Sequence, residues 1–186
     1  ARPIAPSGWT IEETFRVRQV SHVRVSPDRR RVLYTVRTAR LVGDKGDYLH
    51  RLHVADTDGA NEQALTSEDT SATGGEWSPD GRWIAYLGDR SGASRDPTIW
   101  LIPAAGGSPR AIDVGGTGAA NLRWAPDGRA VAFTMPATPT AAQAEAEQHP
   151  GAPRVMDADV RRIRLWVVSI GDDGAAGGVR ALSPDS

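Results

Sequence analysis

Arginine and aspartate side chains cluster late in the sequence, at Arg154, Asp157, Arg161 and Arg162. A planar guanidinium can hold a carboxylate through two parallel hydrogen bonds, which suits arginine to the binding of anionic groups. Arg154, Asp157 and Arg161 are therefore our candidate binding residues. The alternative is a solvated surface loop whose charges pair locally and contribute little energy.

The histidines do not form a metal site. None of His22, His50, His53 and His149 has a partner at the spacing of a metal-binding helix. His50 and His53 fall in an expected strand, where residues three apart point to opposite faces. Cysteine is absent, which excludes thiolate metal sites and cysteine catalysis. We expect neither a metal nor another cofactor.

Charge and hydropathy exclude further function classes. The 186 residues include 22 Lys or Arg against 23 Asp or Glu, a net charge of −1. This balance creates no overall field that would attract nucleic acid or an anionic membrane surface. No apolar run approaches the roughly 18 residues of a membrane span. We therefore expect no nucleic-acid partner and no membrane partner.

Three similar units must position any site that the chain carries. The tripeptides Ser26-Pro27-Asp28, Ser78-Pro79-Asp80 and Ala125-Pro126-Asp127 recur about every 50 residues. Each is followed by an apolar residue, an aromatic residue, a second apolar block and a single closing apolar residue. The aromatic positions are Tyr34, Tyr86 and Phe133, and the closing positions are Leu65, Ile112 and Leu182. Trp77, Trp100, Trp124 and Trp166 also recur in register, and we expect them in cores between the units.

The repeated tripeptide is a turn signal between two strands. Proline presets φ at the first central position, aspartate bonds the backbone two residues on, and glycine adopts positive φ. Arg29 stands where the other units have Gly81 and Gly128, so the first turn is either strained or of another type. The flanking blocks are β-branched and aromatic, as strands prefer. For the second unit we predict strands near 73–77, 82–88, 98–103 and 109–114.

Four short strands in a unit of about 50 residues indicate a β-propeller blade. The expected fold class is all-β, a propeller fragment of about three four-stranded blades. We place an N-terminal segment at 1–19, blade 1 at 20–70, blade 2 at 71–117 and blade 3 at 118–186. An insertion at about 136–160 interrupts blade 3. Since closed propellers have about 4–8 blades, we expect further polypeptide to cover the open edge.

The opening of the chain resembles that of bacterial prolyl-oligopeptidase-type (S9) serine peptidases, closest to the acylaminoacyl-peptidase and dipeptidyl-peptidase branch. The similar run extends from Trp9-Thr10-Ile11-Glu12-Glu13 through Val25-Ser26-Pro27-Asp28 to Tyr34-Thr35. Trp77 to Tyr86 fits the same blade type. The blade motif alone is shared with TolB-like exported proteins and with other WD40-like repeats.

The resemblance implies a propeller that covers an α/β-hydrolase domain, filters peptide substrates and contributes binding residues. The catalytic domain would lie outside this chain, because no Gly-x-Ser-x-Gly nucleophile elbow occurs here. Arg154, Asp157 and Arg161 would then meet the carbonyl, amine or carboxylate of a short peptide. The expected partners are the remaining blades and the hydrolase domain, with a homo-oligomer as a further option.

Two other interpretations stay open. One is a non-catalytic TolB-like propeller that binds proteins, and the other is a propeller fused to an amidohydrolase. The resemblance implies a bacterial protein that is either cytoplasmic or exported to the periplasm or medium. The Ala1–Pro6 start is compatible with a mature end left after export.

Overall fold

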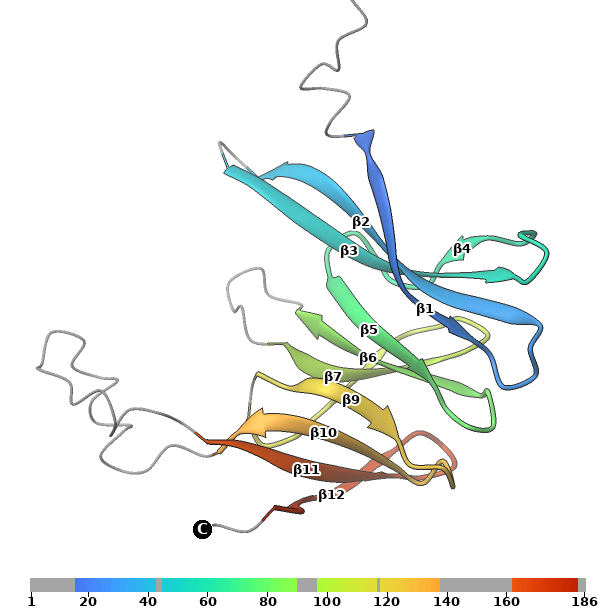
Figure 1. Ribbon diagram of the computed structural model, residues 1–186. Coiled ribbons are helices and arrows are strands. Elements are labelled where there is room, and N and C mark those ends of the chain that lie inside the picture. Colours follow the sequence, from blue (N-terminus) through green and yellow to red (C-terminus); the bar gives the residue numbers. More distant parts are fainter. Residues whose placement is uncertain (1–15, 43–44, 90–96, 117, 138–161, 184–186) are drawn as a thin grey trace, which may run out of the picture.

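The computed structural model describes residues 16–42, 45–89, 97–116, 118–137 and 162–183. These residues form three antiparallel sheets of four strands each (Figure 1). Blade 1 contains β1 (Arg18–Val25), β2 (Arg31–Val42), β3 (Lys45–Asp56) and β4 (Gln63–Ala64). Blade 2 contains β5 (Ser71–Trp77), β6 (Trp83–Asp89), β7 (Thr98–Pro103) and β8 (Arg110–Ile112). Blade 3 contains β9 (Ala120–Trp124), β10 (Ala130–Pro136), β11 (Ile163–Ile170) and β12 (Ala176–Ala181).

Each blade is a meander, because its strands pair in sequence order with their neighbours. The predicted fold class is confirmed, and the four strands expected in the second unit lie within two residues of the observed ones. The closing residues also keep their register: Leu65 and Leu182 each donate a backbone hydrogen bond of 2.8 Å to the third strand of their blade, and Ile112 pairs with Ile99.

The insertion of blade 3 separates two strands that pair directly. β10 and β11 are in register from Ala130–Ser169 to Pro136–Ile163, and the Ala137 amide donates to the Arg162 carbonyl at 2.8 Å. The inserted segment therefore leaves and re-enters at the same end of one hairpin. Residues 138–161 lie outside the described part of the chain.

Two hydrophobic cores hold the blades together, one on each side of blade 2. Leu33, Leu52 and Val54 of blade 1 pack against Tyr86 and Ile84 of blade 2. Alternate residues of blade 2, among them Ala85 and Leu101, point the other way and pack against Val131, Phe133 and Val168 of blade 3. Blade 2 is thus apolar on both faces, which explains its nearly continuous apolar strands.

Tryptophans in the first strands link each blade to the one before it. Trp77 donates its indole N–H to the Arg24 carbonyl at 3.2 Å, and Trp124 donates to the Glu76 carbonyl at 3.1 Å. Trp77 is buried and Trp124 is half-buried against the second core. The expectation that both lie between blades is confirmed. The equivalent residue of blade 1 is Val25, which is 55% exposed.

The Ser-x-Asp turns have a repeated hydrogen-bond pattern. In blade 2 the Ser78 hydroxyl donates to Asp80 at 2.6 Å and accepts the Trp83 amide at 2.9 Å. Burial acts to raise the pKa of Asp80, but hydrogen bonds from Ser78 and from Arg82 lower it to about 2. Blade 3 has Ala125 in place of the serine and keeps the bond from the Arg129 amide to Asp127.

The first turn is strained rather than of another type. Arg29 donates its amide to the Ser26 carbonyl at 2.9 Å, the same bond that Gly81 makes to Ser78 at 2.8 Å. Arg29 therefore adopts φ 61°, close to the 71° of Gly81 and the 72° of Gly128. A side chain disfavours this left-handed conformation because its Cβ approaches the following carbonyl oxygen.

The outer faces of the two end blades are apolar. Val25 pairs with Val32, next to Leu33, whose side chain enters the core between blades 1 and 2. Strand alternation therefore puts Val25 on the opposite, uncovered face. In blade 3, Leu165 pairs with Thr134, next to the buried Phe133, and is 42% exposed.

The indole hydrogen bond between blades gives a first prediction. Replacing Trp77 by Phe keeps the aromatic bulk but leaves the Arg24 carbonyl unpaired, and should lower the free energy of unfolding by about 1 kcal/mol. Replacing it by Ala should cost about 3–5 kcal/mol. Urea unfolding followed by circular dichroism measures both values. Trp83→Phe is the control, since the buried Trp83 Nε1 has no hydrogen-bond partner in the described structure and its loss should cost little.

The strained turn gives a second prediction. Arg29→Gly should stabilise the protein by about 0.5–1 kcal/mol, after the greater flexibility of glycine in the unfolded chain is subtracted. Gly128→Ala should instead lower the stability, because it forces a residue with a side chain into the left-handed conformation. The added Cβ would make only ordinary contacts, the nearest with Pro79 at 3.6 Å, so the change in stability reports the backbone strain alone. Thermal unfolding compares the two variants. A lower melting temperature for Arg29→Gly would contradict the strain argument.

Candidate functional site

The same bulge occurs in the first strand of every blade. Between Ser21 and Arg24 the strand advances three residues while its partner advances two, and the same shift follows Thr73 and Ala120. The first bulged residue is left-handed each time: His22 at φ 51°, Gly74 at 63° and Asn121 at 52°. Bulges of this kind bend a strand and redirect the side chains that follow.

Three charged residues follow these bulges and meet across the blades. Arg24, Glu76 and Arg123 occupy equivalent positions, three residues before the turn proline. Arg24 Nε lies 3.1 Å from Glu76 Oε1, and Arg123 Nη1 lies 2.7 Å from the same oxygen. We call these three residues the charge ladder. Its carboxylate is 17% exposed, whereas the two arginine side chains are 40% and 64% exposed.

A pocket of about 320 Å³ opens beside the charge ladder. It is lined by β1, β5 and β9 together with Leu87 of β6, and includes His22, Gly74 and Asn121. The first strands of the three blades therefore converge on one concave surface, which we call the first-strand pocket. Two guanidinium groups against one carboxylate leave it one net positive charge, so its chemistry favours an anionic group.

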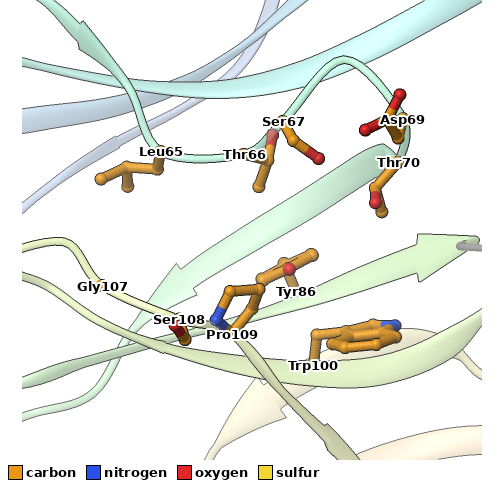
Figure 2. Close-up of a pocket in the computed structure, with 10 residues that line it drawn as sticks. All are labelled: Leu65, Thr66, Ser67, Asp69, Thr70, Tyr86, Trp100, Gly107, Ser108 and Pro109. Carbon is orange, nitrogen blue, oxygen red and sulfur yellow. The ribbon is translucent and has the colours of Figure 1, made fainter.

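A second cavity of similar volume lies between blades 1 and 2, near the outer strands. Figure 2 shows the Leu65–Thr70 segment on one side and Tyr86 and Trp100 on the other. These aromatic side chains are only 1% and 6% exposed, so their faces already belong to the core. Asp69 and several hydroxyl groups supply the remaining polarity. This cavity has fewer charged groups that could bind a ligand than the first-strand pocket.

Serine–histidine contacts in the described residues do not build a catalytic triad. Ser71 Oγ lies 3.4 Å from His50 Nδ1, across the interface of blades 1 and 2. A triad needs a carboxylate to orient the other ring nitrogen, and His50 makes no second hydrogen bond within the described residues. Burial lowers the pKa of His50, with a smaller effect of Arg37 in the same direction. His53 lies on the opposite face, as predicted, beside Glu62 at 3.2 Å.

The predicted site residues are not the ones that form the first-strand pocket. Arg154, Asp157 and Arg161 lie within residues 138–161, which are outside the described part of the chain. The binding role of these three residues therefore stays a prediction. The charge ladder was not predicted, although a charged residue recurs in register three positions before each turn proline. Within the described ranges, no group of three or more His, Asp or Glu side chains could hold a metal ion. No helix in those ranges is long and apolar enough to cross a membrane.

Comparison with known sequences gives one informative relative. No family model matches the chain. The Tol-Pal system protein TolB of Chromobacterium violaceum is 30% identical over 129 residues, which are 56% of this chain and 29% of that protein.

Solved structures with the same fold include peptidases and TolB proteins. The acylaminoacyl peptidase of Pyrococcus horikoshii has a TM-score of 0.60 at 15% identity, covering 90% of this chain and 25% of that one. The β-propeller domain of the Trilobed protease of Pyrococcus furiosus has a TM-score of 0.59 at 16% identity, covering 90% and 43%. A structure assigned to TolB from Agrobacterium tumefaciens has a TM-score of 0.54 at 25% identity, covering 86% and 47%.

These comparisons bear on the fold and not on an activity. The chain spans between about a quarter and a half of the length of these proteins. It is part of a β-propeller that is similar both to the propellers of an acylaminoacyl peptidase and the Trilobed protease and to TolB. The expected propeller fold is therefore confirmed, while the narrower acylaminoacyl- or dipeptidyl-peptidase assignment stays a prediction.

The charge ladder gives a third prediction. Glu76→Gln should lower the free energy of unfolding by about 1–2 kcal/mol, because two guanidinium groups lose their common carboxylate. The loss should shrink at 1 M salt, where exposed charges are screened. Glu68→Gln is the matched control: Glu68 pairs with Arg51 at 3.0 Å but is 78% exposed, so its loss should stay near zero. Equal effects of the two variants would contradict a structural role of the ladder.

Proposed function

We propose that this chain is the access and binding propeller of a serine peptidase of the prolyl-oligopeptidase type. The substrates are short peptides, and the nucleophile lies in an α/β-hydrolase domain outside the chain. The propeller itself performs no bond cleavage. It controls which peptides reach the catalytic domain and supplies contacts to them.

The observation that carries this proposal is the first-strand pocket. A propeller has a central channel, and strands that converge from successive blades face it. The converging strands here carry the charge ladder and a concave, polar surface, whereas the faces between blades are apolar. Polar groups placed on the channel side suit contact with a peptide in transit, which presents carbonyl, amide and terminal groups.

One further observation supports the peptidase assignment, and another supports the partners that we propose. The run from Trp9 to Thr35 resembles the opening of these peptidases, including the segment that precedes blade 1. The uncovered apolar faces of blades 1 and 3, represented by Val25 and Leu165, suit packing against further blades. We propose that these blades and the hydrolase domain are the partners of this chain.

A TolB-like binding propeller is the second candidate function. It is favoured by the 30% identity with TolB of Chromobacterium violaceum and by the 25% identity with the TolB structure from Agrobacterium tumefaciens. In this case the channel side would bind a protein segment and no hydrolysis would follow. The two candidates share the propeller and differ in whether a nucleophilic serine accompanies it.

Serine-directed labelling separates the two candidates and is our fourth prediction. The complete product of the gene, treated with a fluorophosphonate probe, should be labelled at one serine outside residues 1–186. The same preparation should hydrolyse short aminoacyl, acylaminoacyl or dipeptidyl p-nitroanilides, and labelling should abolish this activity. Peptide mapping by mass spectrometry locates the label. A label on a serine of this chain would contradict the division of labour, and no label with no hydrolysis would favour the TolB-like candidate.

A further inference from the structure

The Arg123 guanidinium has one edge occupied and one edge open. Its Nη1 donates to Glu76 Oε1 at 2.7 Å and to the Leu122 carbonyl at 2.7 Å, which uses both hydrogens of that nitrogen. Nε and Nη2 donate no hydrogen bond within the part of the chain that the structure describes. These two nitrogens form the side of the guanidinium whose parallel N–H groups match the two oxygens of a carboxylate.

The contacts of Nη1 also fix how the open edge is presented. Glu76 is mostly buried and is held from the other side by Arg24, whose Nε lies 3.1 Å from the shared oxygen. Glu76 therefore acts as a positioning residue for Arg123. A guanidinium whose plane is set by two hydrogen bonds loses less freedom when it binds a ligand, which improves affinity.

The surroundings of this edge suit a small anion. Arg123 is 64% exposed and lines the first-strand pocket, whose volume of about 320 Å³ admits a peptide terminus. The pocket keeps one net positive charge after the ladder is paired. Its neutral polar wall includes Asn121, which donates to Thr134 Oγ1 at 3.0 Å, and the backbone of Gly74.

We propose that Arg123 binds a peptide carboxylate through its Nε–Nη2 edge, and that the group bound is the C-terminal carboxylate of the peptide in the channel. This inference rests on the proposed function, because it names the part of the peptide substrate that the propeller recognises. It assigns preference for free peptide acids to the first strand of blade 3.

Direct binding tests the proposal without relying on catalysis. The complete protein, treated with a fluorophosphonate to stop turnover, is titrated calorimetrically with tetra-alanine as the free acid and as the C-terminal amide. The acid should bind about 10- to 100-fold more tightly than the amide, as expected for a charge-assisted pair. In Arg123→Gln the two peptides should bind equally, with the affinity of the amide unchanged. In Arg123→Lys, which keeps the charge but loses the parallel donors, only part of the preference should remain.

Arg180→Gln is the matched control, because it removes the same charge from β12, the fourth strand of the same blade. It should keep the full preference of the wild-type protein. Equal binding of acid and amide by the wild-type protein would overturn the proposal, whatever happens to the folding of Arg123→Gln. A preference retained by Arg123→Gln would overturn it as well.

A third peptide distinguishes the two sources of a carboxylate. If an amide with one internal aspartate binds as tightly as the free acid, and loses this advantage in Arg123→Gln, the carboxylate site is supported but the C-terminal assignment is overturned. Failure of the proposed function has a different signature. A protein that takes no fluorophosphonate label and cleaves no peptide contradicts the peptidase assignment, while the calorimetric comparison still decides whether Arg123 binds carboxylates.

Discussion

The structure depends on sheets that are apolar on both faces and must therefore be covered on both faces. Blade 2 meets this constraint, since Ile84 and Tyr86 pack toward blade 1 while Ala85 and Leu101 pack toward blade 3. A blade cannot be stable alone, and its energy comes largely from its neighbours. The indole hydrogen bonds of Trp77 and Trp124 add a polar link to the backbone of the preceding blade and so fix the position of each blade relative to it. Stacking of this kind brings equivalent residues of successive blades side by side.

Because equivalent residues lie side by side, the repeated position before each turn forms a candidate binding site. Arg24, Glu76 and Arg123 are about 50 residues apart in the chain, yet their side chains share one carboxylate oxygen. The bulge before each of them interrupts the regular pairing of the first strand, and the first-strand pocket opens beside it. In every blade the bulge places two residues of the first strand opposite one residue of the second strand. The residue that follows the bulge therefore has the same backbone position in each blade. The identity of the charged residue is then free to vary from blade to blade.

Local signals made most of the fold predictable. The Ser-Pro-Asp turns, the apolar blocks and the closing residues each report on their own strand, so strand limits and blade order follow from the sequence. The strain at Arg29 could be predicted only in part, because the sequence shows that the glycine is missing but does not show which type of turn forms. The bulges were hidden, since His22, Gly74 and Asn121 share no side-chain chemistry and are alike only in tolerating positive φ. The charge ladder needed knowledge of which residues stacking brings together. The candidates Arg154, Asp157 and Arg161 rested on clustering in sequence alone, which does not fix where an insertion places its side chains.

Function in such a repeat is expected where equivalent positions differ. Positions that serve the stack are nearly invariant among the blades, as the turn prolines and the aromatic residues of the second strands are. The ladder position instead alternates between arginine, glutamate and arginine, a choice that the backbone does not require. Alternation lets the central carboxylate satisfy both neighbours, and it leaves the arginine at the blade 3 end with an open edge. This open edge allows the ladder to bind a ligand in addition to linking the three blades.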